Sequence, residues 1–127
     1  MESLSINKTA STPSVSYNTE ANTFSIIGRS YPENARDFYI PIIKWINENY
    51  LQITSPFVLE INLEYYNTAS SKFILEILHK FEELYTVKNI DAKIIWQYLQ
   101  NDDDMKDAGK EYMQIVKMPF EFAEIAL

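Results

Sequence analysis

The chain of 127 residues contains no cysteine, one histidine and only two glycines. Without cysteine it has no disulfide, no thiolate nucleophile and none of the usual thiolate ligands of structural zinc. Gly28 and Gly109 lie far apart, which excludes the glycine-rich phosphate loops of P-loop and dinucleotide-binding proteins. His79 has no second histidine or cysteine with which to form a metal site or a nucleophile–base pair, so we expect it to be a surface residue.

Long apolar runs and excess positive charge are also missing. No stretch approaches the roughly 20 apolar residues that span a bilayer, and the first residues lack the basic leader and apolar core of a secretory signal. The net charge of -7 and the pI near 4.6 disfavour binding to nucleic acids and to anionic membranes. The sequence therefore predicts a cytoplasmic protein with no nucleic-acid partner and no direct membrane insertion.

Apolar residues are plentiful, at 46% of the chain, and aromatic residues make up 14%. This composition is typical of a folded protein, and the length suits one hydrophobic core rather than two. Residues 1–12 are polar and unpatterned and are predicted to form a flexible N-terminal tail. Residues 13–127 are predicted to form a single domain.

Apolar periodicity predicts five strands and three helices. The predicted strands are residues 14–17, 23–27, 57–64, 93–99 and an edge strand within 120–127. The first helix is expected to start at a capping box formed by Ser30 and Glu33 and to be kinked, or to start late, at Pro41. The second helix should follow the polar step 67–72 and continue to Tyr85, and the third should bury Met105, Ala108, Tyr112, Ile115 and Val116.

The element order is β-β-α-β-α-β-α-β. Right-handed crossovers between successive strands make the central strands parallel and place the helices mainly on one face. The predicted fold class is therefore α/β, with a mixed four- to five-stranded sheet. Residues 18–22 between the first two strands are turn-forming and predict a hairpin.

Thr68 is the most informative polar residue, because it lies where a strand ending in Glu64-Tyr65-Tyr66 passes into the second helix. One interpretation is structural: its hydroxyl caps the helix, which is worth about 1 kcal/mol. The other is functional: Thr68 is phosphorylated, which adds a charge of about -1.5 to -2 that the helix dipole tolerates at this end. The two roles are compatible.

Two groups of acidic residues invite catalytic or metal-binding interpretations. Glu60 and Glu64 share one face of a strand, but four strand intervals separate their backbones by roughly 13 Å, wider than the roughly 5–9.5 Å between glycosidase carboxyls. The run 102–104 lacks the glycine and terminal glutamate of an EF-hand loop. It is better interpreted as the cap of the third helix.

Several segments together resemble one family, the SiaC-type regulatory phosphoproteins of bacteria, which are similar to anti-sigma-factor-antagonist (STAS-like) domains. The central block Leu63-Glu64-Tyr65-Tyr66-Asn67-Thr68-Ala69-Ser70-Ser71-Lys72 is the most specific. The other segments, in order, are Thr12-Pro13-Ser14-Val15, Ser30-Tyr31-Pro32-Glu33-Asn34-Ala35, Phe38-Tyr39 with Pro41 and Trp45, Asp103-Asp104-Met105 with Ala108-Gly109, and Met118-Pro119-Phe120. The chain departs from the usual block at Tyr66, where phenylalanine is common, and at Ala69, where serine is common.

The resemblance implies a non-catalytic switch without a cofactor or metal. Thr68 would be phosphorylated by a partner Ser/Thr kinase of the anti-sigma type and restored by a PP2C-like phosphatase. The unphosphorylated form would bind a diguanylate cyclase through its GGDEF domain and activate it, which promotes cyclic-di-GMP synthesis, aggregation and biofilm formation.

The predicted partner-binding residues surround Thr68. Glu64, Tyr65, Tyr66 and Lys72 are expected to form the recognition surface, and Asn67, Ser70 and Ser71 to shape the start of the helix. Two alternatives remain open at this point. One is a STAS-like antagonist in a sigma-factor pathway, and the other is a small enzyme that uses the open acidic face of the sheet.

Overall fold

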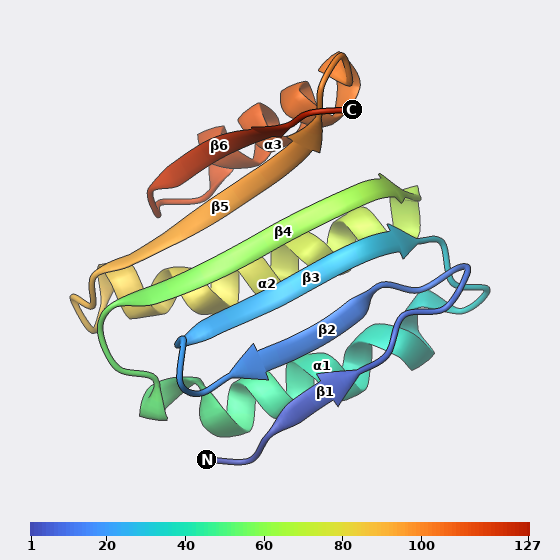
Figure 1. Ribbon diagram of the computed structural model, residues 1–127. Helices are drawn as coiled ribbons and strands as arrows, with labels where there is room; N and C mark the ends of the chain where they lie inside the picture. The colour runs from blue at the N-terminus through green and yellow to red at the C-terminus, as the bar shows by residue number, and fades with distance from the viewer.

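Six strands form one sheet, in which they lie side by side in the order of the sequence (Figure 1). The computed structural model describes all residues, 1–127. The strands are β1 (Leu4–Ile6), β2 (Ser14–Asn18), β3 (Thr23–Ser30), β4 (Phe57–Tyr66), β5 (Ala92–Leu99) and β6 (Phe120–Ile125). The pairs β1–β2 and β2–β3 are antiparallel, and β3 to β6 run parallel.

Three helices connect the parallel strands and cover one face of the sheet (Figure 1). They are α1 (Ala35–Asn49), which is followed by the 3-10 turn η1 (Tyr50–Gln52), α2 (Thr68–Thr86) and α3 (Asp103–Ile115). Every crossover steps in the same direction along the sheet, so right-handed connections place all three helices on the same side. None of these helices combines the length and the apolar character that crossing a bilayer requires.

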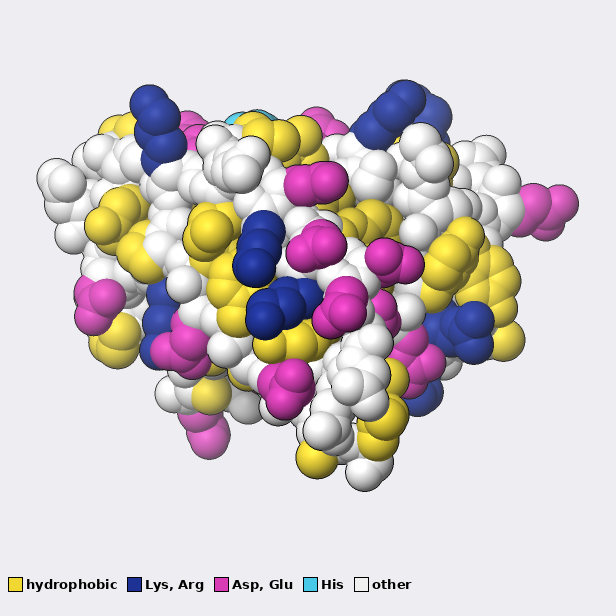
Figure 2. All heavy atoms as spheres, turned by 90° about the horizontal axis from the view of Figure 1, so that it is seen from above, with side chains coloured by type: hydrophobic (Ala, Val, Ile, Leu, Met, Phe, Trp, Pro, Cys, Tyr) yellow, Lys and Arg dark blue, Asp and Glu magenta, His cyan; other side chains and the backbone are white.

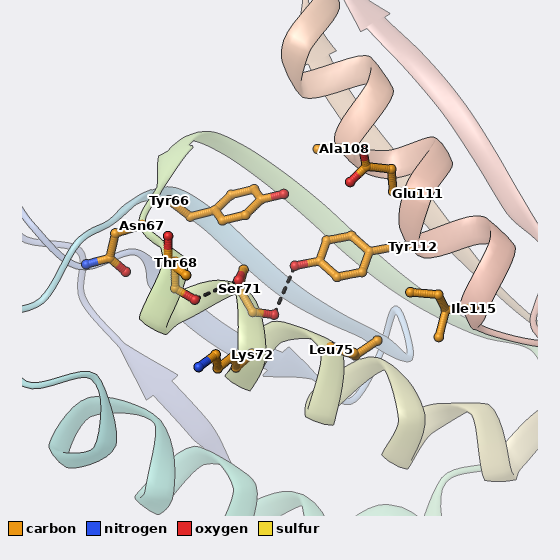
Figure 3. A pocket seen from close by; sticks show the side chains of 10 residues that line it. All are labelled: Tyr66, Asn67, Thr68, Ser71, Lys72, Leu75, Ala108, Glu111, Tyr112 and Ile115. Carbon is orange, nitrogen blue, oxygen red and sulfur yellow. Dashed lines mark hydrogen bonds between the residues drawn. The ribbon is translucent and has the colours of Figure 1, made fainter.

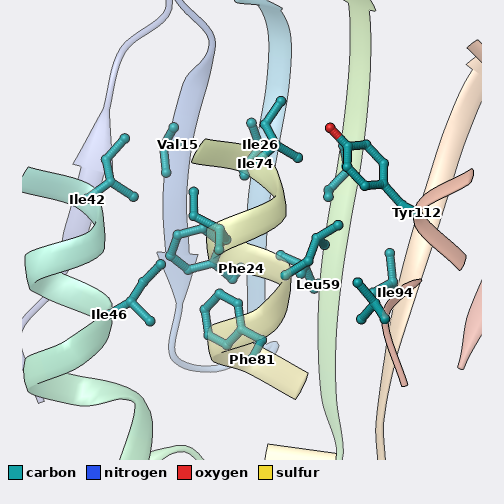
Figure 4. Close-up of a cluster of buried hydrophobic side chains, with 14 of the residues drawn as sticks. Val15, Phe24, Ile26, Ile42, Ile46, Leu59, Ile74, Phe81, Ile94 and Tyr112 are labelled. Atoms are coloured by element: carbon teal, nitrogen blue, oxygen red, sulfur yellow. The ribbon is translucent and has the colours of Figure 1, made fainter. Parts of the chain in front are cut away.

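The hydrophobic core lies between the sheet and the helices (Figure 4). Phe24, Leu59 and Ile94 occupy matching positions of β3, β4 and β5, and all three are fully buried. Phe81 of α2 packs on this layer, with its ring 5.0 Å from that of Phe24. The opposite face of the sheet is only partly covered, as the alternating burial along β5 shows.

A β-bulge near the end of β4 decides which way its last residues point. The pairing of β3 with β4 shifts register after Gly28, so that Arg29 pairs with Tyr65 and Glu64 is the extra residue. Gly28 has φ +130°, a conformation that other residues rarely adopt, and an added Cβ would lie 3.3 Å from Pro13 Cα. Because a bulge interrupts the alternation of a strand, both Glu64 and Tyr65 are exposed and Tyr66 is half-buried.

Most of the predicted architecture is confirmed: the hairpin of β2 and β3, the parallel central strands and the helices on one face. The strand count was too low, because the sheet has six strands. The prediction of a flexible tail over residues 1–12 was also wrong, since Leu4–Ile6 pairs with β2. Leu4 and Ile6 are half-buried against the core, so two apolar side chains suffice to add this short edge strand.

The start of α1 differs from the prediction. Ser30 is the last residue of β3, and the N-cap is Asn34, whose side chain accepts a hydrogen bond from the backbone N–H of Asp37. The helix runs from Ala35 without the predicted late start and contains Pro41. Pro41 is exposed, so the helix loses its backbone hydrogen bond on the solvent side.

Two residues predicted to face the core are exposed instead. Tyr85 in the last turn of α2 is 41% exposed, and Ile115 at the end of α3 is 53% exposed. The helical period placed both on the apolar stripes, but the packing of the helices leaves both side chains largely uncovered. The exposure of Ile115 bears on the site described next.

Candidate functional site

The candidate site lies where β4 passes into α2. The backbone N–H of Asn67 donates to the carbonyl of Ser30 at the end of β3, at 2.9 Å. The Asn67 side chain accepts a hydrogen bond from the backbone N–H of Ser70, also at 2.9 Å. Asn67 is therefore the N-cap of α2, and Thr68 is its first helical residue. The prediction that Thr68 caps the helix was wrong, because an equally favourable capping residue stands immediately before it.

Thr68 is exposed, and its hydroxyl makes no hydrogen bond within the chain. The backbone carbonyl of Thr68 accepts a bond from the Ser71 hydroxyl at 2.7 Å, which holds the first turn together (Figure 3). The hydroxyl oxygen of Thr68 is thus open to solvent at the positive end of a helix of 19 residues.

Ser70 has the opposite environment, although it lies only two residues away. Its side chain is fully buried and accepts a hydrogen bond from the Ser30 hydroxyl at 2.9 Å. The Ser30 oxygen also lies 2.6 Å from the phenolic oxygen of Tyr39 in α1. The prediction that Ser70 contacts a partner was therefore wrong, because one turn of a helix that rests on a sheet always directs some residues into the core.

A groove of about 380 Å³ lies between α2 and α3, next to Thr68 (Figure 3). Five of the residues that line it belong to the central block of the sequence, namely Tyr66, Asn67, Thr68, Ser71 and Lys72. The other five are Leu75 of α2 and Ala108, Glu111, Tyr112 and Ile115 of α3. Thr68 therefore lies at the edge of a concave surface that two helices form together.

Two tyrosines connect α3 to the start of α2. The Tyr112 hydroxyl donates to the carbonyl of Ser71 at 3.0 Å, and its ring lies 6.5 Å from that of Tyr66 (Figure 3). Burial is the main cause that raises the pKa of both phenols, and for Tyr112 the neighbouring Tyr66 raises it further. Both side chains therefore stay protonated far above neutral pH, and that of Tyr112 serves as a hydrogen-bond donor.

The charges around Thr68 are of both signs. Lys72 and Glu111 are exposed on opposite walls of the groove, and neither forms an ion pair within the chain. Figure 2 looks onto the edge formed by α3 and β6 and shows acidic side chains clustered beside a few basic ones. Within the groove an added phosphate would thus meet one cation, Lys72, and one carboxylate, Glu111.

Glu64 and Tyr65 were predicted on the same surface, but the bulge turns them away from the groove. The rings of Tyr65 and Tyr31 meet edge to face at 5.8 Å, and the Arg29 guanidinium lies 5.6 Å from the Tyr31 ring. Glu64 lines a separate hollow with Arg29 and Tyr31. The end of β4 thus divides the predicted surface into two parts. Asn67 lines both the groove beside Thr68 and a hollow that contains Tyr65.

The remaining polar candidates are Asp102 in the acidic run and His79. Asp102 is the N-cap of α3 and accepts a hydrogen bond from the backbone N–H of Met105 at 3.0 Å, as predicted for the acidic run. His79 is exposed, and its Nδ1 lies 3.4 Å from Glu82. No group of three or more His, Cys, Asp or Glu side chains is arranged to hold a metal ion.

Sequence reasoning missed the wall that α3 contributes to the site. Ala108, Glu111, Tyr112 and Ile115 lie about 40 residues after Thr68 and carry no local signal for a binding surface. Three of them had been assigned to the core face of the helix on periodicity alone. Only the packing of α3 beside α2 brings them next to Thr68.

Comparison with known proteins gives a consistent result. The model of the SiaC family regulatory phosphoproteins matches residues 6–125. The protein PA14_02130 of Pseudomonas aeruginosa (strain UCBPP-PA14) is 28% identical over 120 residues, which is 94% of each chain. The crystal structure of apo-SiaC from Pseudomonas aeruginosa has a TM-score of 0.84 at 28% identity and covers 97% of this chain and 99% of its own.

A second solved structure contains a relative in a complex. It is the diguanylate cyclase SiaD with its activator SiaC from Pseudomonas aeruginosa, and the matching chain has a TM-score of 0.87 at 27% identity. The match covers 96% of this chain and 99% of that one.

Proposed function

Because this chain belongs to the SiaC family of regulatory phosphoproteins, we propose that it is a non-catalytic interaction switch controlled by phosphorylation of Thr68. A partner Ser/Thr kinase of the anti-sigma type adds the phosphate, and a PP2C-like phosphatase removes it. The unphosphorylated form binds a diguanylate cyclase and activates it, so that the switch governs cyclic-di-GMP synthesis.

One observation carries this proposal: Thr68 combines an exposed, unbonded hydroxyl with a position at the start of α2. A kinase needs access to the oxygen, and Thr68 has that access, whereas Ser70 is buried. Because Asn67 and not Thr68 caps the helix, esterifying the Thr68 oxygen breaks no hydrogen bond of the fold. The positive end of the helix dipole favours the added negative charge.

The effect of the phosphate is then local. It places a charge of about -1.5 to -2 at the edge of the groove between α2 and α3 without removing a contact of the core. A partner that docks on this surface meets a desolvation cost and, where it carries acidic groups, a repulsion. Phosphorylation thus switches docking off while the domain stays folded.

The cyclase partner is inferred from the relative of known structure, since SiaC of Pseudomonas aeruginosa is the activator of the cyclase SiaD in their complex. The absence of catalysis is inferred from the family and from the tyrosines of the groove. Their pKa values are shifted upwards, away from neutrality, which is opposite to what a general base near pH 7 requires.

The test combines mass spectrometry with enzyme assays. The purified protein is incubated with the anti-sigma-type kinase of its own organism and ATP, and we expect a single phosphate on Thr68 and none in the Thr68→Ala variant. A diguanylate cyclase of the same organism is then assayed for cyclic-di-GMP with each form. Activation by the unphosphorylated form alone supports the proposal, whereas label on Ser71, or equal activation by both forms, contradicts it.

A further inference from the structure

The groove between α2 and α3 has an apolar wall that the core covers only in part. Leu75 is half-buried on α2, and Ile115 is 53% exposed on α3. Ala108, with its small side chain, leaves space higher along the same wall of α3 (Figure 3). Ile115 is therefore available for contact with a partner, because covering its side chain would remove apolar area from water.

The polar end of the groove carries a lysine, Lys72, that forms no ion pair within the chain. Lys72 lies four residues after Thr68 on α2, so the two side chains are neighbours on the helix surface. The Lys72 ammonium has no carboxylate partner in the chain, although acidic residues outnumber basic ones by 18 to 11. Glu111 on the facing wall is unpaired as well, so the groove presents one free charge of each sign.

We propose that this groove binds one large apolar side chain of the downstream partner, flanked by a partner carboxylate that pairs with Lys72. The inference rests on the proposed role of Thr68 and names the surface and the residue through which the phosphate acts. The chemistry of this side chain and its neighbours is inferred from the groove. The apolar wall matches an apolar side chain, and the Lys72 ammonium matches a carboxylate of opposite charge. Glu111 on the facing wall favours a basic group of the partner.

Phosphorylation of Thr68 weakens docking of the partner in two ways. A negative group four residues before a lysine is the more favourable orientation of a helical ion pair, so the phosphate on Thr68 pairs with the Lys72 ammonium. That pair withdraws Lys72 from the partner's carboxylate. The phosphate also stands where the partner's carboxylate would lie, and the two like charges repel each other.

The binding test uses pairs of matched variants. Affinity for the diguanylate cyclase that the wild-type protein activates is measured by calorimetry with the unphosphorylated full chain. Ile115→Arg is compared with Met113→Arg, because Met113 is 43% exposed on the same helix but does not line the groove. Lys72→Glu is compared with Lys44→Glu, an exposed lysine of α1.

We expect Ile115→Arg and Lys72→Glu each to weaken binding at least about tenfold, as loss of a central contact does. Met113→Arg and Lys44→Glu should stay within about threefold of the wild type. Thermal melts of all four variants check that each is folded. If the wild type binds no cyclase, the proposed function itself fails. If the wild type binds and the two groove variants bind equally well, only the groove assignment is overturned.

A second measurement tests the role of Lys72 without any partner. Phosphothreonine is incorporated at position 68 during synthesis, and the second pKa of its phosphate is determined by phosphorus NMR. Replacing Lys72 by glutamine should raise that pKa, because a neighbouring cation favours the dianion. The Lys44→Gln variant should leave it unchanged. An unaltered phosphate pKa in the Lys72→Gln variant overturns the pairing.

Discussion

The hydroxyl of Ser30 donates a 2.9 Å hydrogen bond to the hydroxyl of Ser70, 40 residues further along the chain, and both side chains are fully buried. This bond joins the end of β3 to the first turn of α2 beneath the exposed Thr68. Together with the bond from the Asn67 N–H to the Ser30 carbonyl, it fixes the start of the helix on the sheet. Thr68 is thus exposed on a rigid support, which suits a position that changes charge without unfolding.

The first prediction separates the capping residue, Asn67, from the proposed phosphoacceptor, Thr68. Thr68→Ala should change the free energy of unfolding by less than about 0.5 kcal/mol, as is usual at exposed positions. Asn67→Ala should cost about 1 kcal/mol, because it removes the acceptor for the Ser70 N–H. Urea denaturation followed by circular dichroism measures both. A larger loss in Thr68→Ala than in Asn67→Ala would contradict the capping assignment.

The second prediction concerns the buried hydroxyl cluster. Ser30→Ala removes the shared partner of Ser70 and Tyr39, and each buried hydroxyl left without a partner costs about 1–3 kcal/mol. Ser16→Ala serves as the control, since Ser16 is half-buried in β2 and its side chain makes no hydrogen bond, so a change within about 0.5 kcal/mol is expected. Equal stabilities of the two variants in chemical denaturation would show that the cluster contributes nothing.

The third prediction concerns Gly109 in the middle of α3. An added Cβ would lie 2.5 Å from Cδ1 of Trp96 and 2.8 Å from Cε1 of Phe122, both part of the sheet beneath. Gly109→Ala would gain about 1 kcal/mol in helix propensity, but such overpacking costs about 1–3 kcal/mol and pushes α3 away from β5. We therefore expect a net loss of stability, measured by urea unfolding with tryptophan fluorescence.

The matched control is Lys110→Ala, because Lys110 is exposed on the same helix. It should leave the stability of the protein nearly unchanged. The displaced α3 also carries one wall of the groove, so Gly109→Ala should weaken the proposed binding of a cyclase although Gly109 itself is buried. A Gly109→Ala variant more stable than the wild type would show that the helix–sheet spacing adapts freely.

The fourth prediction is a loss of stability at high pH. Burial raises the pKa of Tyr17, Tyr39, Tyr66 and Tyr112 above the ordinary value of 10.0. The unfolded chain therefore loses these protons first, and the stabilisation is fully present below pH 10 and declines as the pH rises above it. Absorbance of tyrosinate should show part of the nine tyrosines ionising only with unfolding.

Tyr112→Phe identifies the contribution of one of these groups. Its stability should decline less steeply above pH 10 than that of the wild type, because one strongly shifted phenol is gone. At neutral pH it should be less stable by about 1 kcal/mol, the value of the hydrogen bond to the Ser71 carbonyl. Identical alkaline profiles of the two proteins would contradict the raised pKa of Tyr112.

The elements of the fold were largely predictable because their signals are local. The alternation of Phe57, Leu59, Ile61 and Leu63 predicted β4 and its buried face, and the order of elements with right-handed crossovers predicted a parallel sheet with helices on one side. The edge strand β1 escaped prediction because three residues with two apolar side chains give no periodic signal. The caps at Asn34 and Asn67 were misplaced by one to four residues, because several favourable capping residues compete at each site.

The sequence by itself singled out the residue proposed for phosphorylation: Thr68, a threonine at the junction of an alternating strand and an amphipathic helix. Only the tertiary structure decided what surrounds it. The bulge at Glu64 turned Tyr65 away and Tyr66 towards the helices, and the depth of the first turn buried Ser70 beneath Thr68. The packing of α3 beside α2 supplied Glu111, Tyr112 and Ile115. Local periodicity determines the strands and helices, but the neighbours of a surface residue come from segments distant in the chain.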